Sequence, residues 1–346
     1  GNKIHYFHNC FLKDMASMMR AIFIIFCFPI AYSQMVMEPL LPLKKLQLPS
    51  GTVGPEAIAF DILGNGPYTS VADGRVLKYQ GPRIGFTDFA TTSPLRTKEV
   101  CDGKNDPNLL IKCGRPLGIG FYYRSGDLYI ADINYGLLVV GRNGGPARQL
   151  VTGIDGNPFA FTNAVDIDQL NGVVYFTDSG SIFRATSNIT LLLESKDTTG
   201  RLFKYDIRTN QVTLLLSGLA GPAGVAVSLD GSYVLVTELI ANRIKRFWIR
   251  GRKANTAEVF TNLNGYPDNI KKTILGDYFV AVNVVNNQSM TPPKFSFAQR
   301  INVLGNVIVS LNLSAQYRDS ISEVQEQFGR LYIGSLKEDF VGVYGV

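Results

Sequence analysis

The stretches GIGFYYRSGDLYIAD (118–132), AVDIDQLNGVVYFTD (164–178) and GVAVSLDGSYVLVTE (224–238) align almost residue for residue. Each reads as an alternating apolar run, a turn that contains glycine and a second apolar run, which is the pattern of an antiparallel strand pair. Weaker copies occupy residues 57–79, 269–282 and 322–336. The spacing of about 45–60 residues between copies is typical of four-stranded propeller blades, and it favours a propeller over a β-sandwich. Six copies therefore predict an all-β fold, a six-bladed β-propeller around a central channel.

Residues 1–33 have the features of an upstream segment followed by a secretory signal peptide. Arg20 precedes the short apolar run 21–28, and small residues follow it before Gln34; this order is typical of a cleaved signal. An uncleaved membrane anchor is the alternative, but the run is shorter than the roughly 20 apolar residues that a spanning helix needs. We therefore expect residues 34–346 to form a single propeller domain without a membrane span.

Composition and charge narrow the class of function. The chain has 346 residues, of which 46% are hydrophobic and 18% charged. Removal of residues 1–33 leaves 31 basic and 27 acidic residues, without a basic run or a basic-aromatic stripe, so a nucleic-acid partner is not expected. The only two histidines, His5 and His8, lie in the removed segment. The mature chain therefore cannot form a Ser-His-Asp triad, a Cys-His dyad or a His-ligated zinc site.

Two cysteines and three sequons agree with export through the secretory pathway. Cys101 and Cys113 enclose a polar, turn-rich loop, which in a secreted chain predicts a disulfide. A reactive or metal-binding thiol pair is the alternative. Acceptor sequons for N-glycosylation begin at Asn188, Asn287 and Asn312.

In a propeller the innermost strand of each blade lines the channel, so equivalent residues at the starts of these strands should meet at one end of the axis. They are Glu56, Leu117, Asn163, Ala223, Asp268 with Asn269, and the stretch 319–323. Carboxylate and amide oxygens that converge from separate blades suit one Ca²⁺ ion. The alternative is that these side chains cap turns and tie the blades together through backbone hydrogen bonds.

The sequence resembles the strictosidine-synthase-like family of plants. The resemblance covers about residues 50–346 and rests on GPEAIAFD (54–61), CGRPLGI (113–119), LYIADINYGLLVVG (128–141) and GRLYIGSL (329–336), among others. It implies a six-bladed propeller within a wider group that includes paraoxonase-like and gluconolactonase-like calcium hydrolases. It also implies a small-molecule substrate.

On the synthase side, the resemblance places Ser322 where the family's enzyme has its catalytic glutamate, and Ser320 where that enzyme has an active-site histidine. Glu323 follows directly, but successive side chains of a strand face opposite sides. The substrate pocket implied by the resemblance includes Leu117, which replaces an aromatic residue, and Phe161, which keeps one. Strictosidine formation itself is therefore not expected, although another condensation stays open.

On the hydrolase side, the resemblance places calcium ligands at Glu56, Asn163, Asp268 and Asn269. Ala223 stands where those enzymes have a ligand asparagine, and Leu117 stands where they have a histidine. Any general base must then be a carboxylate, and the candidates are Glu56, Asp268, Asp132, Asp178 and Glu238. For the last three, hydrogen bonding between blades is the alternative role.

Three functions follow as hypotheses. The first is calcium-assisted hydrolysis of an ester or lactone, with Ser322, Glu323 and Asp268 as catalytic candidates. The second is a metal-free Pictet–Spengler-type or other condensation in alkaloid biosynthesis, and the third is a non-catalytic propeller that binds a small molecule. The signal and the resemblance predict entry into the secretory pathway and delivery to the vacuole or the apoplast. The oligomeric state stays open.

Overall fold

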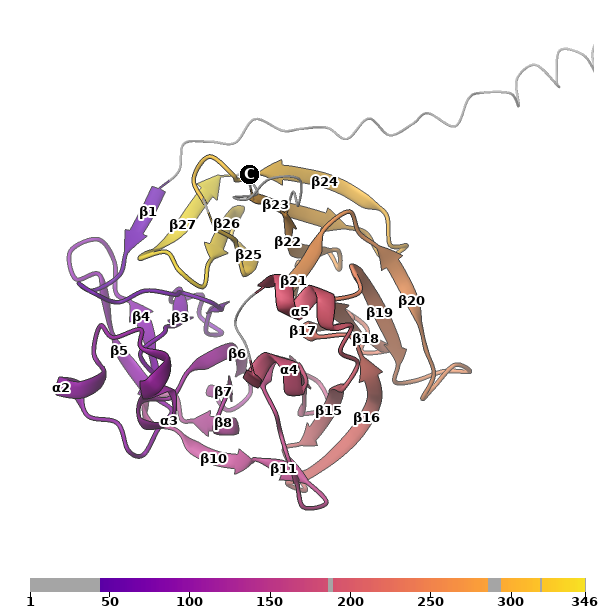
Figure 1. Ribbon diagram of the computed structural model, residues 1–346, viewed down its shortest axis with the longest axis horizontal. Coiled ribbons are helices and arrows are strands. Elements are labelled where there is room, and N and C mark those ends of the chain that lie inside the picture. Colours follow the sequence, from indigo (N-terminus) through magenta and orange to yellow (C-terminus); the bar gives the residue numbers. More distant parts are fainter. Residues whose placement is uncertain (1–43, 186–188, 286–293, 318, 346) are drawn as a thin grey trace, which may run out of the picture. The chain divides into compact units, whose positions relative to one another are not determined.

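The computed structural model describes residues 44–185, 189–285, 294–317 and 319–345. The predicted signal segment 1–33 and the sequons at Asn188 and Asn287 lie outside these ranges. Six antiparallel sheets are arranged as blades around a common centre, in chain order (Figure 1). The predicted six-bladed β-propeller is confirmed.

Apart from β9 in blade 1 and β1 in blade 6, the strands of each blade follow one another along the chain, and the first of these consecutive strands lies innermost. Blade 1 contains β2 (Ile58–Ala59), β3 (Tyr68–Ser70), β4 (Arg75–Tyr79), β5 (Phe86–Thr91) and the short parallel strand β9 (Gly145–Pro146). Blade 2 contains β6 (Pro116–Tyr122), β7 (Asp127–Asp132), β8 (Gly136–Val140) and β10 (Arg148–Val151). Blade 3 contains β13 (Thr162–Asp168), β14 (Val173–Asp178), β15 (Gly200–Asp206) and β16 (Gln211–Leu219).

The second half of the ring repeats this arrangement. Blade 4 contains β17 (Pro222–Val227), β18 (Tyr233–Glu238), β19 (Arg243–Trp248) and β20 (Ala257–Asn262). Blade 5 contains β21 (Tyr266–Lys272), β22 (Tyr278–Val285), β23 (Lys294–Ile301) and β24 (Val307–Asn312). Blade 6 contains β25 (Glu323–Gln327), β26 (Arg330–Gly334), β27 (Phe340–Gly345) and β1 (Lys44–Gln47). A small hairpin, β11 (Gly153–Ile154) with β12 (Asn157–Pro158), lies between blades 2 and 3 in the chain.

Blade 6 closes the ring because its strands come from both ends of the described chain. β1 pairs antiparallel with β27, from Lys44 opposite Val343 to Gln47 opposite Phe340. Leu46 and Leu48 are buried in one apolar cluster with Val341 and Ile58, which joins blade 6 to blade 1. The closing strand thus stabilises the ring through backbone pairing and through apolar burial.

Four of the six inner strands share an irregularity next to the candidate site. The strand register shifts between Pro116 and Ile119 in β6, and equivalent shifts occur in β13, β17 and β21. Such bulges re-aim the side chains that they contain. A Cβ atom on Gly118 would lie 2.7 Å from the Ala164 Cα, because the inner strands of neighbouring blades approach closely there. Glycine is therefore required at this position.

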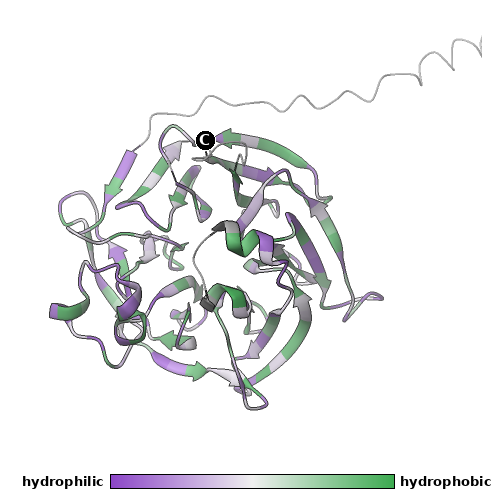
Figure 2. Ribbon diagram, in the orientation of Figure 1, coloured by the Kyte–Doolittle hydropathy of each residue, from purple (hydrophilic) through white to green (hydrophobic). Residues whose placement is uncertain are grey.

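Five short helices lie in the connections between strands: α2 (Lys98–Cys101), the 3₁₀ helix η1 (Pro107–Leu109), α3 (Leu110–Cys113), α4 (Ser181–Ala185) and α5 (Ile189–Ser195). The longest of these has seven residues, so no helix in the described part of the chain can cross a membrane. Helices α4 and α5 connect β14 to β15 and lie near the centre of the ring, where Figure 2 colours much of both as hydrophobic.

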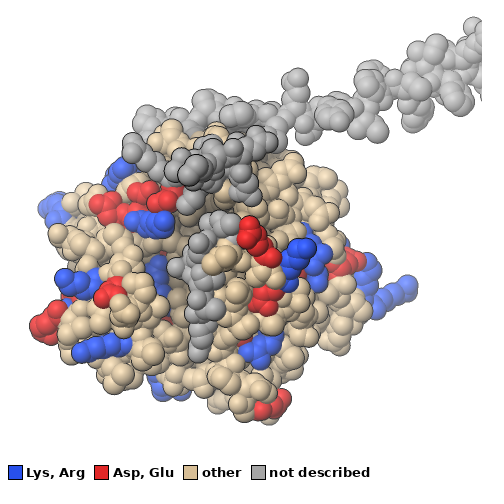
Figure 3. Space-filling model, viewed as in Figure 1, with Lys and Arg blue, Asp and Glu red and all other residues tan. Residues whose placement is uncertain are grey.

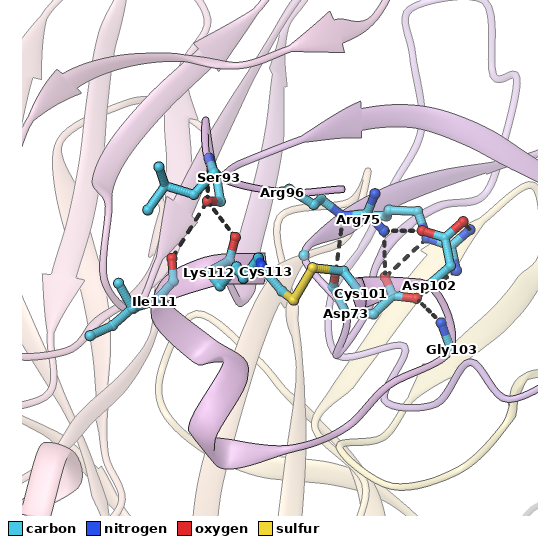
Figure 4. Close-up of a disulfide and its surroundings, with 12 residues drawn as sticks. Asp73, Arg75, Ser93, Arg96, Cys101, Asp102, Gly103, Ile111, Lys112 and Cys113 are labelled. Atoms are coloured by element: carbon cyan, nitrogen blue, oxygen red, sulfur yellow. Dashed lines mark hydrogen bonds and ion pairs between the residues drawn. A yellow bond between two sulfur atoms is a disulfide. The ribbon is translucent and has the colours of Figure 1, made fainter. Parts of the chain in front are cut away.

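The predicted disulfide between Cys101 and Cys113 is confirmed (Figure 4). Its loop is tied to blade 1 through Asp102, whose carboxylate lies 3.7 Å from Arg75 of β4 and also binds Arg96. The Gly103 N–H also donates to Asp73 Oδ2 over 2.9 Å. Asp73 and Arg75 are almost fully buried, so the loop is held by both a covalent and an electrostatic anchor.

We expect the double substitution Cys101→Ser with Cys113→Ser to lower the free energy of unfolding by about 3 kcal/mol, because it removes a cross-link that restricts the unfolded chain. Urea denaturation of variant and wild type measures the difference. Wild type treated with a reducing agent should match the double variant. Equal stability of all samples would instead mean that the ion pairs alone hold the loop.

Candidate active site at the mouth of the channel

Six equivalent positions, one from each blade, surround one end of the channel. The strand registers align them as Glu56, Leu117, Asn163, Ala223, Asp268 and Ser322. All are buried except Asp268, which is partly exposed. The structure therefore brings together the residues that the sequence predicted at the blade starts.

Glu56 and Asn269 form a pair between blades 1 and 5. The Asn269 Nδ2 donates to Glu56 Oε1 over 2.9 Å. This hydrogen bond orients the amide, because a carboxylate accepts from the nitrogen and not from the oxygen. It leaves Glu56 Oε2 and Asn269 Oδ1 buried, and neither has a hydrogen-bond partner among the described residues.

Asn163 presents a third buried oxygen from blade 3. Its Nδ2 donates to Ser179 Oγ over 2.9 Å, while Ser179 Oγ donates to the Pro222 carbonyl over 2.8 Å. Since the serine proton is used on Pro222, Ser179 can only accept from the Asn163 nitrogen. Asn163 Oδ1 therefore points elsewhere, and no donor in the described part of the chain reaches it.

Three acidic side chains share this end of the channel, and burial is the largest cause of their altered pKa values. Burial raises the pKa of Glu56 to about 7 and the pKa of Glu323 to about 7. The pKa of Asp268 is raised well above its usual value by burial and by the charges of Glu56 and Glu323. Crowded carboxylates disfavour ionisation of one another, so this cluster can hold protons near neutral pH.

Two basic residues that the sequence did not single out balance the acids. Lys271 Nζ lies 3.4 Å from Glu323 Oε2. Arg115 is buried, and its charge lowers the pKa of Glu56 against the effect of burial. Each lies two positions from a predicted site residue: Arg115 precedes Leu117 by two, and Lys271 follows Asn269 by two. This spacing could have indicated both residues in the sequence.

Ser322 and Glu323 both make contacts between blades. Ser322 Oγ donates to the Glu56 carbonyl over 2.6 Å, and the Ile58 N–H donates to Glu323 Oε1 over 2.5 Å. The Ser322 proton is therefore engaged with backbone. Glu323 keeps a carboxylate close to the cluster although it is one residue away from the position aligned with the synthase glutamate.

Apolar side chains line the predicted pocket. Leu117 is buried, and Phe161 packs on Phe183 of α4 with ring centroids 5.5 Å apart. Ser320 is partly exposed, and its carbonyl accepts from Ser335 Oγ over 2.8 Å. Figure 3 shows charged side chains of both signs spread over this face, without a broad patch of one sign.

The acids at the ends of the second strands have structural roles. Asp132 accepts from the Arg115 N–H over 2.8 Å, Asp178 accepts from the Phe161 N–H over 2.7 Å, and Glu238 accepts from the Ala220 N–H over 2.8 Å. Each carboxylate thus holds the segment that enters its own blade. These contacts lie within blades, whereas the sequence interpretation placed them between blades; only Asp132 also reaches the preceding blade's connection, through Thr92.

Asn312 is the one predicted glycosylation site that the structure describes. It is exposed at the end of the outermost strand β24, and its Oδ1 accepts from the Ser314 N–H over 2.9 Å. Exposure on an outer edge is what a glycan acceptor requires. Its glycosylation stays a prediction.

Comparison with known proteins identifies the family. Two family models match: "Strictosidine synthase" over residues 163–252 and "Strictosidine synthase-like, N-terminal" over residues 39–79. Protein STRICTOSIDINE SYNTHASE-LIKE 11 of Arabidopsis thaliana is 43% identical over 302 residues, which cover 87% of this chain and 90% of that protein. Strictosidine synthase of Catharanthus roseus is 40% identical over 303 residues, which cover 87% and 86%. The chain belongs to the strictosidine synthase-like family.

Solved structures with the same fold have much lower sequence identity to this chain than these relatives have. A gluconolactonase from Xanthomonas campestris superimposes with a TM-score of 0.62 at 14% identity, over 88% of this chain and 89% of that one. The calcium-binding protein regucalcin from Agrobacterium tumefaciens superimposes with a TM-score of 0.59 at 15% identity, over 88% and 95%. At these identities the likeness shows the propeller fold alone.

The donor set of this strictosidine synthase-like protein fits a hard cation. In the described part of the chain no three His, Cys, Asp or Glu side chains form a metal-binding group. The predicted ligands instead combine carboxylates with amides, as calcium accepts. Three of the four, Glu56, Asn163 and Asn269, each present a buried oxygen without a donor, and such oxygens are costly unless a cation or water satisfies them.

We expect the free energy of unfolding of the EDTA-treated protein to fall as the pH rises from about 4.5 to about 7. Glu323 has a pKa of about 7 in the fold against a usual 4.5, so over this range the native state holds a proton that the unfolded chain releases. Glu323→Gln keeps the acceptor for the Ile58 N–H but cannot ionise, so it should lose less stability. Thermal unfolding across this pH range measures both.

Glu326→Gln is the matched control, since Glu326 is a partly exposed carboxylate on the same strand. It should follow the wild-type profile. Parallel profiles for Glu323→Gln and wild type would contradict the raised pKa of Glu323.

Proposed function

We propose that this protein is a calcium-dependent hydrolase that acts on a small ester or lactone at the mouth of the channel. The observation that carries the proposal is the set of buried oxygens from blades 1, 3 and 5 that have no donor in the described part of the chain. They surround the same end of the axis as Asp268, which is partly exposed and open to a ligand.

Glu56, Asn163, Asp268 and Asn269 would hold the ion. Carboxylate and amide oxygens in flexible geometry suit Ca²⁺ better than transition metals, which prefer imidazole or thiolate ligands. When bound, the cation would polarise a carbonyl group and stabilise negative charge on its oxygen. Ala223, at the start of blade 4, has no side-chain oxygen, although the resemblance implies a ligand asparagine there. The proposed set of calcium ligands therefore has one residue fewer than the set that the resemblance implies.

The proton chemistry must come from carboxylates, because residues 34–346 contain no histidine. Glu323 has a pKa of about 7, so near neutral pH it is close to half ionised and can accept and return a proton. Lys271, 3.4 Å from Oε2, stabilises its ionised form. Ser322 orients the site through its hydrogen bond to the Glu56 carbonyl.

The pocket should select an apolar small molecule. Phe161, directly before β13, packs on Phe183 of α4, and Leu117 is the apolar blade-start residue of blade 2. Apolar walls with a few converging polar groups are typical of small-molecule sites. A gluconolactonase and a calcium-binding regucalcin share the fold, which supports a lactone and a calcium ion as the first choices to test.

A metal-free condensation is the second candidate. It is favoured by 40% identity to strictosidine synthase over 86% of that enzyme and by a carboxylate, Glu323, close to the aligned catalytic position. For either reaction, the Cys101–Cys113 disulfide and the exposed Asn312 support passage through the secretory pathway. We propose the vacuole or the apoplast as its destination.

Calcium should raise the thermal unfolding midpoint of the EDTA-treated protein by about 5 °C or more at saturation, because a ligand that binds only the native state stabilises it. Asn163→Ala should reduce this shift. Gln299→Ala is the matched control, since Gln299 also has a buried amide oxygen without a partner among the described residues but lies on the third strand of blade 5. It should keep the full shift. Absence of a shift at millimolar calcium would refute the metal site.

Lactone and ester hydrolysis should require calcium and should fall about 100-fold in Asp268→Asn, which removes one ligand charge but keeps the shape. A panel of aliphatic and aromatic lactones, assayed with calcium or with EDTA, measures this. Product formation from aldehyde–amine pairs in EDTA, without hydrolysis, would favour condensation. Calcium binding without turnover of either kind would indicate a binding propeller.

A further inference from the structure

The face opposite the candidate site exposes large apolar side chains around the channel. Because every inner strand begins at the site, the turn that follows it lies at the other end of the blade. Each of these six turns carries at least one exposed apolar side chain, such as Leu63, Tyr123, Leu170, Leu229, Ile274 and Phe328. Ile274 is 88% exposed, Leu170 82% and Phe328 79%, so these side chains are not anchored in the core.

The six turns lie around the axis, and contacts join them at three of the six blade junctions; we call their exposed apolar side chains the apolar ring. Phe328 of blade 6 lies against Gly64 of blade 1, and Leu229 of blade 4 lies against Gly276 of blade 5. The Tyr123 N–H of blade 2 donates to Gln169 of blade 3 over 2.9 Å. Contiguous exposed apolar patches of this kind mark interaction surfaces.

The charges on this face have a consistent pattern. Arg83, Arg124, Arg142 and Arg252 lie in turns at the same end of the blades and are exposed, and none has an ion pair with a described residue. Nearby acids accept from N–H groups of their own turns, and two of them also pair with other arginines: Asp168 lies 3.9 Å from Arg250 and Asp206 lies 3.5 Å from Arg208. The carboxylate of Asp168, for example, accepts from the Leu170 and Asn171 N–H groups, and those of Asp61, Asp206 and Asp230 make similar contacts.

The chain also enters the described part at this face. Lys44 pairs with Val343 near the end of β27, and Arg330 of the blade 6 turn pairs with Gly345. The sequence directly before it, MVMEPLLPL (35–43), is apolar apart from one acid. The described chain therefore begins at the outer edge of this face, on the outermost strand of blade 6.

We propose that the apolar ring docks on a lipid bilayer with anionic headgroups. Apolar side chains surrounded by arginines are the composition of surfaces that lie in a membrane interface. Six turn tips at the ends of similar strand pairs can touch a planar surface together. A second copy fits less well, because its arginines would face those of the first and repel them. The apolar ring lies at the opposite end of the channel from the candidate active site. The proposal therefore does not depend on which reaction the protein catalyses.

Vesicle flotation tests it with the full chain, expressed through a secretory host and with its mature N-terminus mapped by mass spectrometry. Mapping ensures that binding does not come from retained residues 21–28. Wild type should bind vesicles of phosphatidylcholine with about one-third phosphatidylserine, and bind pure phosphatidylcholine less, with added salt weakening the binding. Ile274→Ser combined with Phe328→Ser should weaken binding about tenfold or more.

Leu214→Ser combined with Val259→Ser is the matched control, since both residues are exposed apolar side chains on outermost strands. It should bind as wild type does. Both variants should keep the wild-type unfolding midpoint, because the replaced side chains are exposed. Equal binding by the ring variant and wild type, or equal loss in ring variant and control, would overturn the proposal. A dimer in sedimentation velocity that only the ring variant dissociates would overturn it in favour of a second copy.

Discussion

Convergence of six inner strands on one axis leaves little space where neighbouring blades approach most closely. Gly118 and Gly224 occupy this approach, and a Cβ on either would lie 2.7 Å from backbone atoms of the next blade. Bulges in the inner strands of blades 2 to 5 redirect the side chains beside this approach. Short side chains such as Ala223 and Ser322 fit there readily, whereas Glu56 and Asn269 are joined by a hydrogen bond across blades. The geometry of the site thus follows from the closure of the ring.

Closure of the ring also determines the pKa values of the acidic side chains at the site. Three acids brought to one place and removed from water repel one another, and burial raises the pKa values of Glu56, Glu323 and Asp268. Arg115 and Lys271 compensate in part. The desolvation cost of the three buried oxygens that have no donor among the described residues remains. Beside them, Glu323 places a buried carboxylate one residue after Ser322.

The repeats in the sequence were sufficient to predict the fold, because each strand pair keeps its alternation and its glycine turn. The blade-start residues could be predicted for the same reason, since equivalent bulges place them. Arg115 and Lys271 could be located only by their spacing from Leu117 and Asn269, because the acids that they balance lie on other blades that are distant in sequence. The orientation of the Asn163 amide also depends on Ser179 and Pro222, and no local pattern encodes that chain of hydrogen bonds. The helices α4 and α5 are too short to produce a clear helical period.

The two ends of the propeller are separated by its strands. Inner strands of about six residues at roughly 3.3 Å per residue place the apolar ring about 20 Å from the blade-start ring. Over that distance, exposed charges at one end act only weakly on groups at the other at physiological salt. The bulges constrain the residues at the site end, whereas the turn tips need only a glycine and a tight reversal. Apolar side chains at those tips therefore add nothing to folding. Their presence in all six turns is better explained by a surface that they contact than by the stability of the fold.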